Sequence, residues 1–103
     1  MKTKSVHEVS FLGYDCILHF PSYNNGRKAI QLIGKEDGEP IATATVNLRD
    51  EPLAPDTVFI KDYSENNGML ATLVKAGIVS EPLRYVLSGF VKIPVCKLLI
   101  PIV

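Results

Sequence analysis

The sequence has no long hydrophobic run and no apolar leader segment. Its longest nearly apolar stretch is LLIPIV, residues 98–103, which is far shorter than the roughly 20 residues that a membrane-spanning helix needs. The first ten residues, MKTKSVHEVS, contain two lysines that no apolar segment follows, so a secretory signal is not predicted. We therefore expect a cytoplasmic protein that does not enter a membrane.

Cysteine is scarce as well. Cys16 and Cys96 are the only two, and they lie far apart without a C-x-x-C pattern, which is the spacing typical of redox and metal sites. A chain of 103 residues can bury enough surface to fold as one domain, residues 1–103, without disulfides or metal. We interpret both cysteines as buried core thiols in a reducing compartment.

Catalytic motifs are missing too. There is no G-x-S-x-G, no phosphate-binding loop and no H-E-x-x-H. His19 falls on the face of a predicted strand opposite Cys16, which disfavours a Cys–His pair within that strand, while a pair of His19 with Cys96 stays open. The acidic residues around 50–62 lack the spacing of a calcium loop. We therefore predict no enzyme activity, no cofactor and no metal site.

The net charge is zero, but it is unevenly distributed. Residues 1–35 carry +3, residues 36–65 carry −6 and residues 66–103 carry +3. No basic cluster is interleaved with aromatic residues, so direct binding of nucleic acid is not predicted. The acidic middle could meet a basic partner. The alternative is that its carboxylates only solvate loops.

Alternating apolar residues and turn signals predict strands over much of the chain. The predicted strands are residues 15–20, 27–33, 41–48 and 57–61, followed by a C-terminal hairpin around Ser88-Gly89. In the first of them, Cys16, Leu18 and Phe20 share one face. Pro94 suits an edge strand or a bulge, because it cannot donate a hydrogen bond to a neighbouring strand.

The segment IATATVNL, residues 41–48, shows the cleanest alternation. One predicted face consists of small and apolar residues, namely Ala42, Ala44, Val46 and Leu48. The small alanines indicate that another element packs closely over this face, and the helix is the expected candidate.

The segment DYSENNGML, residues 62–70, precedes an apolar stripe at helical spacing. We predict a helix over 65–76, with Ser64 as N-cap and Asp62 as a second candidate. Gly77 is placed to end the helix in a Schellman motif, with Ile78 folding back on Leu73. Capping explains most of the polar segment.

The predicted fold class is therefore α+β, a mainly antiparallel β-sheet with one helix (65–76) packed on it. The apolar C-terminus must be buried, since monomers rarely expose such a patch. It either completes the sheet or packs on a second copy, which leaves a homo-oligomer possible.

Three blocks of the sequence resemble a known family: GEPIATATVNL (38–48), LAPDTVFIKDYSENNGMLATLVKAGIV (53–79) and GFVKIPVCKLL (89–99). Over about residues 11–99 the chain is similar to a small family of unknown function from phages and mobile elements of gut bacteria. Its most specific wording is IKDYSENNGML, residues 60–70. The family carries no known chemistry, and it is associated with one of the anti-CRISPR inhibitors of the type II-A nuclease.

The resemblance implies an anti-defence protein that binds the type II CRISPR nuclease in the bacterial host cell. With zero net charge, blocking of activation or cleavage is expected rather than mimicry of DNA. From the acidic segment we predict five partner-binding residues: Asp50, Glu51, Asp56, Asp62 and Glu65. The alternative is a protein of a phage or mobile element that binds or sequesters a small ligand, such as a nucleotide signal, through Arg27, Asn47, Arg84 and Tyr63.

Overall fold

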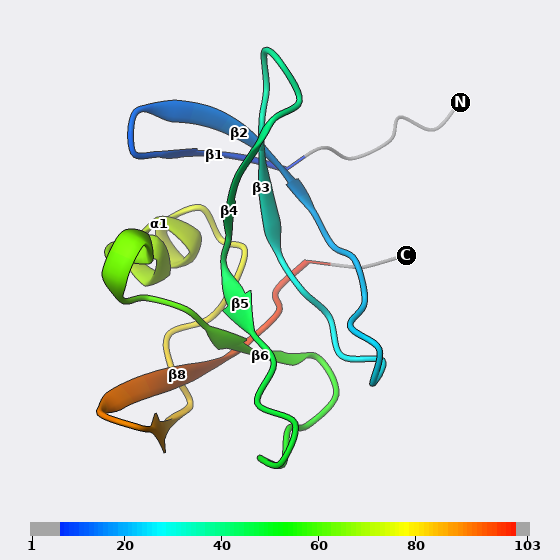
Figure 1. Ribbon diagram of the computed structural model, residues 1–103, viewed down its shortest axis with the longest axis vertical. Coiled ribbons are helices and arrows are strands. Elements are labelled where there is room, and N and C mark those ends of the chain that lie inside the picture. Colours follow the sequence, from blue (N-terminus) through cyan, green and yellow to red (C-terminus); the bar gives the residue numbers. More distant parts are fainter. Residues whose placement is uncertain (1–6, 101–103) are drawn as a thin grey trace.

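The computed structural model describes residues 7–100, and it contains two four-stranded antiparallel sheets and one short α-helix (Figure 1). The α+β fold class predicted from the sequence is confirmed, with two sheets in place of one. The elements in chain order are β1 Glu8–Phe11, β2 Tyr14–His19, β3 Gln31–Gly34, β4 Pro40–Thr43, β5 Thr45–Val46, β6 Thr57–Ile60, the 3₁₀ turn η1 Ser64–Asn66, α1 Met69–Lys75, β7 Arg84–Ser88 and β8 Val91–Lys97.

The first sheet is a meander in the order β1-β2-β3-β4. Leu12 and Gly13 connect β1 to β2 and both have positive φ, 54° and 82°, as the two-residue turns of tight hairpins require. Cys16 and Leu18 are buried on the inner face of β2, as predicted. The strand predicted over 27–33 begins only at Gln31, because residues 22–28 form a loop. This loop is closed by a hydrogen bond from the N–H of Tyr23 to the carbonyl of Arg27 and by a bridge between Ser22 and Lys28.

The second sheet has the order β5-β6-β8-β7, so the last two strands form the predicted C-terminal hairpin. Pro94 lies in β8, opposite Tyr85 of β7. The residues of β8 that pair with β6 are 95–97. Pro94 therefore sits just beyond the β6 ladder, where its missing N–H breaks no pairing.

Residues 41–48 do not form one strand, and the chain changes sheets at Ala44. The N–H of Ala44 donates to the carbonyl of Ile30 at 2.7 Å, and the carbonyl of Ala44 accepts from the N–H of Lys61 at 2.7 Å. β4 before it therefore belongs to the first sheet and β5 after it to the second. The predicted apolar face is divided in the same way: Ala42 and Ala44 belong to the core between the sheets, and Val46 and Leu48 to a smaller cluster.

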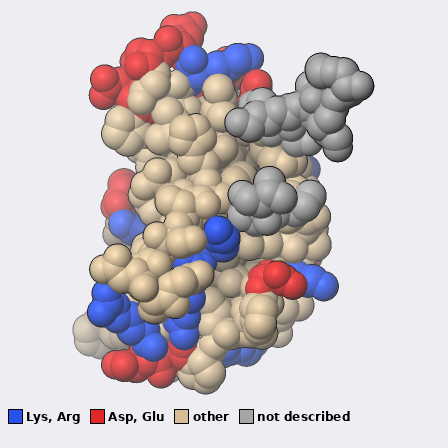
Figure 2. All heavy atoms as spheres, turned by 90° about the vertical axis from the view of Figure 1, so that its right-hand side faces the viewer, with Lys and Arg blue, Asp and Glu red and all other residues tan. Residues whose placement is uncertain are grey.

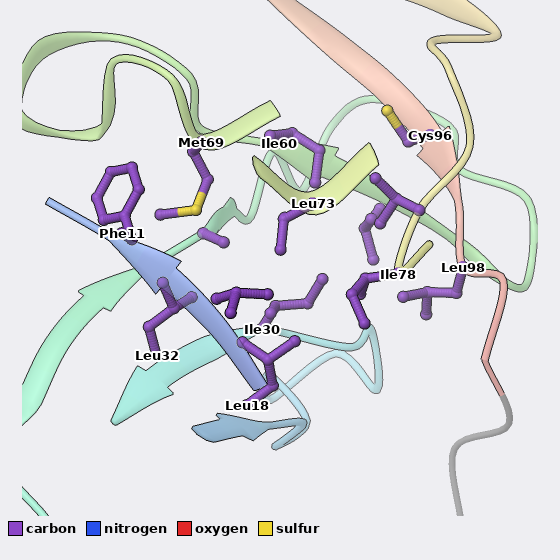
Figure 3. Packing of buried hydrophobic residues seen from close by; sticks show 14 of the residues in the cluster. Phe11, Leu18, Ile30, Leu32, Ile60, Met69, Leu73, Ile78, Cys96 and Leu98 are labelled. Carbon is purple, nitrogen blue, oxygen red and sulfur yellow. The ribbon is translucent and has the colours of Figure 1, made fainter. Parts of the chain in front are cut away.

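The main core lies between the two sheets and α1 (Figure 3). Met69 and Leu73 of α1 are fully buried there, together with Leu32 from β3 and Ile60 from β6. A smaller cluster covers the other face of the second sheet and consists of Phe59, Val86, Ile93 and Val95 with partly buried neighbours from 46–53. The segment over residues 47–56 therefore acts as a lid on this second cluster.

The C-terminus joins the core in part. Leu98 is buried and forms a bridge with Val79, while the N–H of Leu99 donates to the carbonyl of Ile78 at 2.9 Å. Leu98 thus packs within the chain without becoming part of a strand, whereas Leu99 is 52% exposed. The alternative that this segment packs on a second copy stays a prediction. Residues 101–103 lie outside the described residues.

The predicted start of the helix is wrong. Gly68, with φ of 96°, is the N-cap of α1, and residues 64–66 form the separate turn η1. Ser64 has φ of 56° and makes no capping hydrogen bond. The carboxylate of Asp62 instead accepts from the N–H of Leu70 at 2.8 Å, which satisfies one of the unpaired donors of the first turn.

The predicted end of the helix is correct. Gly77 has φ of 76°, its N–H donates to the carbonyl of Val74, and the N–H of Ile78 donates to the carbonyl of Leu73. These are the two hydrogen bonds of a Schellman motif.

The structure predicts that Asp62, not Ser64, stabilises the start of α1. Asp62→Ala should lower the free energy of unfolding by about 1 kcal/mol, the typical value for the loss of a capping acceptor. Asp62→Asn keeps a side-chain oxygen and should lose less. Ser64→Gly should lose nothing, because glycine tolerates the positive φ. Denaturant unfolding of the three variants measures these differences, and a larger loss for Ser64→Gly than for Asp62→Ala would contradict this account of the cap.

Candidate functional site

The two cysteines are buried and free, as predicted. Burial raises the pKa of the Cys96 thiol to about 11, with smaller contributions from the carboxylates of Glu81 and Asp62. Burial also raises the pKa of Cys16, and Asp15 adds to the shift. A nucleophilic cysteine needs the opposite shift, toward the thiolate. Neither thiol is therefore suited to catalysis.

The remaining Cys–His alternative has no support in the geometry. His19 is exposed on the outer face of β2, whereas Cys96 is fully buried. Within residues 7–100, no group of three or more His, Cys, Asp or Glu side chains is arranged to hold a metal ion. In the same range, every buried side-chain nitrogen and oxygen has a hydrogen-bond partner.

The five acidic residues predicted to bind a partner are not equivalent. Asp62 holds the first turn of α1. Glu65 forms an ion pair with Lys61 at 2.6 Å, and the hydrogen bond from Lys61 lowers the pKa of Glu65. Asp50 and Asp56 are exposed and Glu51 is half-buried, all three in the segment over residues 47–56. The structure brings Asp50 and Glu51 together in one turn and gives Asp62 and Glu65 structural contacts of their own.

Two arginines hold the turn that carries Asp50 and Glu51. The guanidinium of Arg27 donates to the carbonyl of Leu48 at 2.8 Å and to the carbonyl of Glu51 at 2.7 Å. The guanidinium of Arg84 donates to the carbonyl of Pro52 at 2.7 Å. These charge-assisted hydrogen bonds are stronger than neutral ones. We call residues 47–52 with the two arginines the clamped loop.

Two further contacts stiffen the clamped loop. The side-chain amide of Asn25 donates to the side-chain oxygen of Asn47 at 3.1 Å. Arg27 also lies 5.8 Å from the ring centre of Phe59, which adds a cation–π attraction. The loop is thus fixed from the β2–β3 connection on one side and from β7 on the other.

The residues of the alternative small-ligand site are largely used in this way. Arg27, Asn47 and Arg84 do converge, but their polar groups contact the protein itself. Tyr63 packs on the second cluster and lies under Lys61, with 5.6 Å between the ammonium and the ring centre. The sequence analysis named Arg27, Asn47 and Arg84 together, but it missed that these side chains bond to the protein itself and hold a loop in place.

Two hollows border the clamped loop. One of about 710 Å³ lies between residues 25–28, 53–57 and 98–100. The other, of about 400 Å³, lies between residues 47–51 and the end of β7 at Leu87 and Ser88.

The −6 charge of residues 36–65 does not form one surface. Glu36, Asp37 and Glu39 surround the turn between β3 and β4, at one end of the molecule, and the clamped loop lies at the other end (Figure 1). Acidic and basic side chains are mixed at both ends of the face in Figure 2. Around the clamped loop the bases are Arg27, Arg84 and the loop's own Arg49.

The arginine clamp should contribute to stability. Arg27→Lys keeps the charge but cannot donate in a fork to two carbonyls, so we expect the free energy of unfolding to fall by about 1–3 kcal/mol. Amide hydrogen exchange in residues 48–53 should become faster. Arg49→Lys, an exposed change in the same loop, is the control. Equal effects of the two variants in both measurements would show that the clamp does not order the loop.

The raised pKa of Cys96 predicts a pH dependence of stability. The unfolded thiol ionises near its ordinary pKa of 9.0, while the folded thiol stays protonated up to about 11. The unfolded state thus loses its proton first, and the free energy of unfolding should fall by about 2 kcal/mol as pH rises through this window. Cys96→Ala should flatten that decline in urea titrations at several pH values. An unchanged slope would contradict the shift.

Comparison with protein-family models, curated proteins and solved structures finds no match to this chain. The family resemblance in the sequence thus stays an expectation. Among residues 7–100 the structure has no helix of the length and apolar character that crossing a bilayer requires.

Proposed function

We propose that the protein is a non-catalytic inhibitor that binds a type II RNA-guided nuclease in the bacterial cytoplasm through a protein–protein interface. The observation that carries the proposal is the clamped loop. Its backbone carbonyls bind Arg27 and Arg84, and it carries the exposed Asp50 and the half-buried Glu51. Loops held on a rigid scaffold are where binding residues concentrate.

The loop is ordered before it meets a partner, and this lowers the entropy cost of binding. Its acidic side chains can steer it toward a basic surface, since complementary charge mainly raises the association rate. An RNA-guided nuclease presents such surfaces along its nucleic-acid channels. The loop is therefore proposed to contact a basic protein surface of the nuclease, not its nucleic acid.

The distribution of charge supports inhibition by blocking activation or cleavage over DNA mimicry. A DNA mimic would present a continuous acidic surface, because a duplex carries a negative charge about every 1.7 Å along its axis. Here the acids are divided between the β3–β4 turn, the loop over residues 47–56 and the start of α1. Two of them, Asp62 and Glu65, already serve structural contacts.

The second candidate function is binding of a small phosphorylated ligand, such as a nucleotide signal. The 710 Å³ hollow favours it, because Arg27 and Lys28 line that hollow. Both guanidinium groups of the predicted set already bond carbonyl oxygens, which leaves fewer donors for phosphate. Native mass spectrometry of the purified protein distinguishes the candidates: a retained small molecule supports the ligand, and a complex with the nuclease supports the inhibitor.

Removing the loop's negative charge should slow association with the nuclease. We expect Asp50→Lys, Glu51→Lys and Asp56→Asn together to lower the on-rate at low salt by about tenfold, and raised salt should weaken wild-type binding more than binding of the variant. Asp56 is changed to Asn because its φ of 70° suits Asn better than Lys. Surface plasmon resonance with the guide-loaded nuclease measures both rates.

A matched control changes the net charge equally at the other end of the molecule. It combines Glu36→Lys, Glu39→Lys and Asp37→Asn, and the asparagine keeps the side-chain oxygen that accepts from the N–H of Glu39. The control should bind and inhibit like the wild type. Equal inhibition by the loop variant and the wild type would show that the clamped loop is not the interface.

A further inference from the structure

Exposed apolar side chains gather at the C-terminal hairpin. Of the large hydrophobic residues that are at least half exposed among residues 7–100, four lie within eight positions: Leu83, Tyr85, Leu87 and Phe90. Leu87 is 71% exposed and Phe90 is fully exposed. Such clustering on a monomer usually marks an interaction site.

The same hairpin carries an open sheet edge. Within residues 7–100, β7 is the outer strand of the second sheet and has β8 as its only strand partner. The other outer strands are protected: β5 has only two residues, β1 packs against α1, and the carbonyl of Thr43 at the end of β4 accepts from the side chain of Asn66 at 2.7 Å. Natural proteins usually shorten, cover or charge their edges in these ways.

The hairpin register shows which backbone groups of β7 face outward. The two-residue turn 89–90 makes Ser88 a member of a closing hydrogen-bonded pair, and such pairs alternate along an antiparallel ladder. Val86 therefore bonds inward to β8 as well. The N–H and carbonyl groups of Tyr85 and Leu87 point away from β8, toward the open edge.

Pro94 agrees with this assignment. It lies opposite Tyr85, in a pair that exchanges no hydrogen bonds, so its missing N–H costs β7 nothing. The open edge thus offers one N–H donor and one carbonyl acceptor from each of Tyr85 and Leu87, which are separated by Val86.

We propose that β7 pairs with β7 of a second copy of this chain, antiparallel and about a two-fold axis at Val86, so that the two second sheets form one continuous sheet of eight strands. In this register Tyr85 of each copy exchanges hydrogen bonds with Leu87 of the other. Val86 lies opposite Val86 of the second copy, and Arg84 lies opposite Ser88 of the second copy.

The strand is self-complementary in three respects. The two residues whose backbone N–H and carbonyl groups point away from β8, Tyr85 and Leu87, are placed symmetrically about Val86, as an isologous interface requires. Each apolar side chain gains a cross-strand apolar neighbour, and aromatic–aliphatic pairs of this kind stabilise sheets. The only charge of the strand, Arg84, meets a hydroxyl and not a second arginine. A chain of zero net charge adds no long-range repulsion between copies.

The first test is the mass in solution as a function of concentration. By sedimentation velocity, the wild type should shift from the 11.3 kDa monomer to twice that mass. Leu87→Lys places a charge on the pairing edge and should remain monomeric. Phe90→Lys, outside the paired residues, is the matched control and should still dimerise. A wild type that stays monomeric at every concentration overturns the proposal, and so does equal disruption by the two variants.

The second test reads the register and does not depend on Leu87→Lys folding. A Tyr85→Cys chain and a Leu87→Cys chain, mixed under mild oxidation, should form a disulfide-linked heterodimer, because paired residues lie within disulfide reach. Either chain alone should crosslink several-fold less. The native thiols of Cys16 and Cys96 are buried, so the wild-type chain should not crosslink and serves as the control for disulfides that do not involve the introduced cysteines. Equal crosslinking in the mixture and in the single chains overturns the two-fold register.

Discussion

The whole arrangement depends on one buried residue, Ala44, whose two backbone groups bond to different sheets. Its N–H donates to Ile30 of the first sheet region and its carbonyl accepts from Lys61 beyond β6. The neighbouring Thr45 hydroxyl accepts from the N–H of Ile30 and also bonds to the Tyr23 hydroxyl at 2.7 Å. Because buried backbone groups must find partners, this crossing fixes how far apart the sheets lie. Ala44 is fully buried, so a larger side chain there would have to separate the layers.

The candidate site inherits its geometry from that crossing. The chain leaves β5 two residues after Ala44 and enters the clamped loop directly. Arg27 reaches the loop from the connection between β2 and β3, and Arg84 reaches it from β7. A loop bonded from both sheets keeps its shape only while the sheets keep their separation. Core packing and the surface presented to a partner are therefore coupled, although neither Asp50 nor Glu51 is part of the main core cluster.

Sequence reasoning succeeded where the signal is local. The alternation of residues 15–20, the buried cysteines and the Schellman ending at Gly77 all follow from side-chain period or backbone freedom over a few residues. It failed where the structure depends on contacts between residues that are not neighbours in the sequence. The alternation of apolar and polar residues over 41–48 is the same for one strand as for two strands joined at Ala44. The change of sheet alters which strands are hydrogen-bonded to this segment, but not the two-residue period of its side chains. The start of α1 was missed because Ser64 and Gly68 both suit a helix boundary, and the acceptor comes from Asp62.

The partner-binding prediction shows how charge along a chain differs from charge on a surface. Residues 36–65 carry −6, yet two arginines from positions 27 and 84 stand beside their central turn. The guanidinium groups bond to backbone carbonyls and not to the carboxylates of the exposed Asp50 and the half-buried Glu51. The arginines therefore fix the shape of the loop, while their positive charge weakens the acidic field around it. In recognition by such a loop, the remaining acidic charge acts on the association rate, and the affinity must rest on the fixed shape of the loop. Among residues 7–100, three of the four outer strands of the two sheets are protected by α1, by Asn66 or by being short. The fourth outer strand, β7, is the one whose residues can pair with β7 of a second copy.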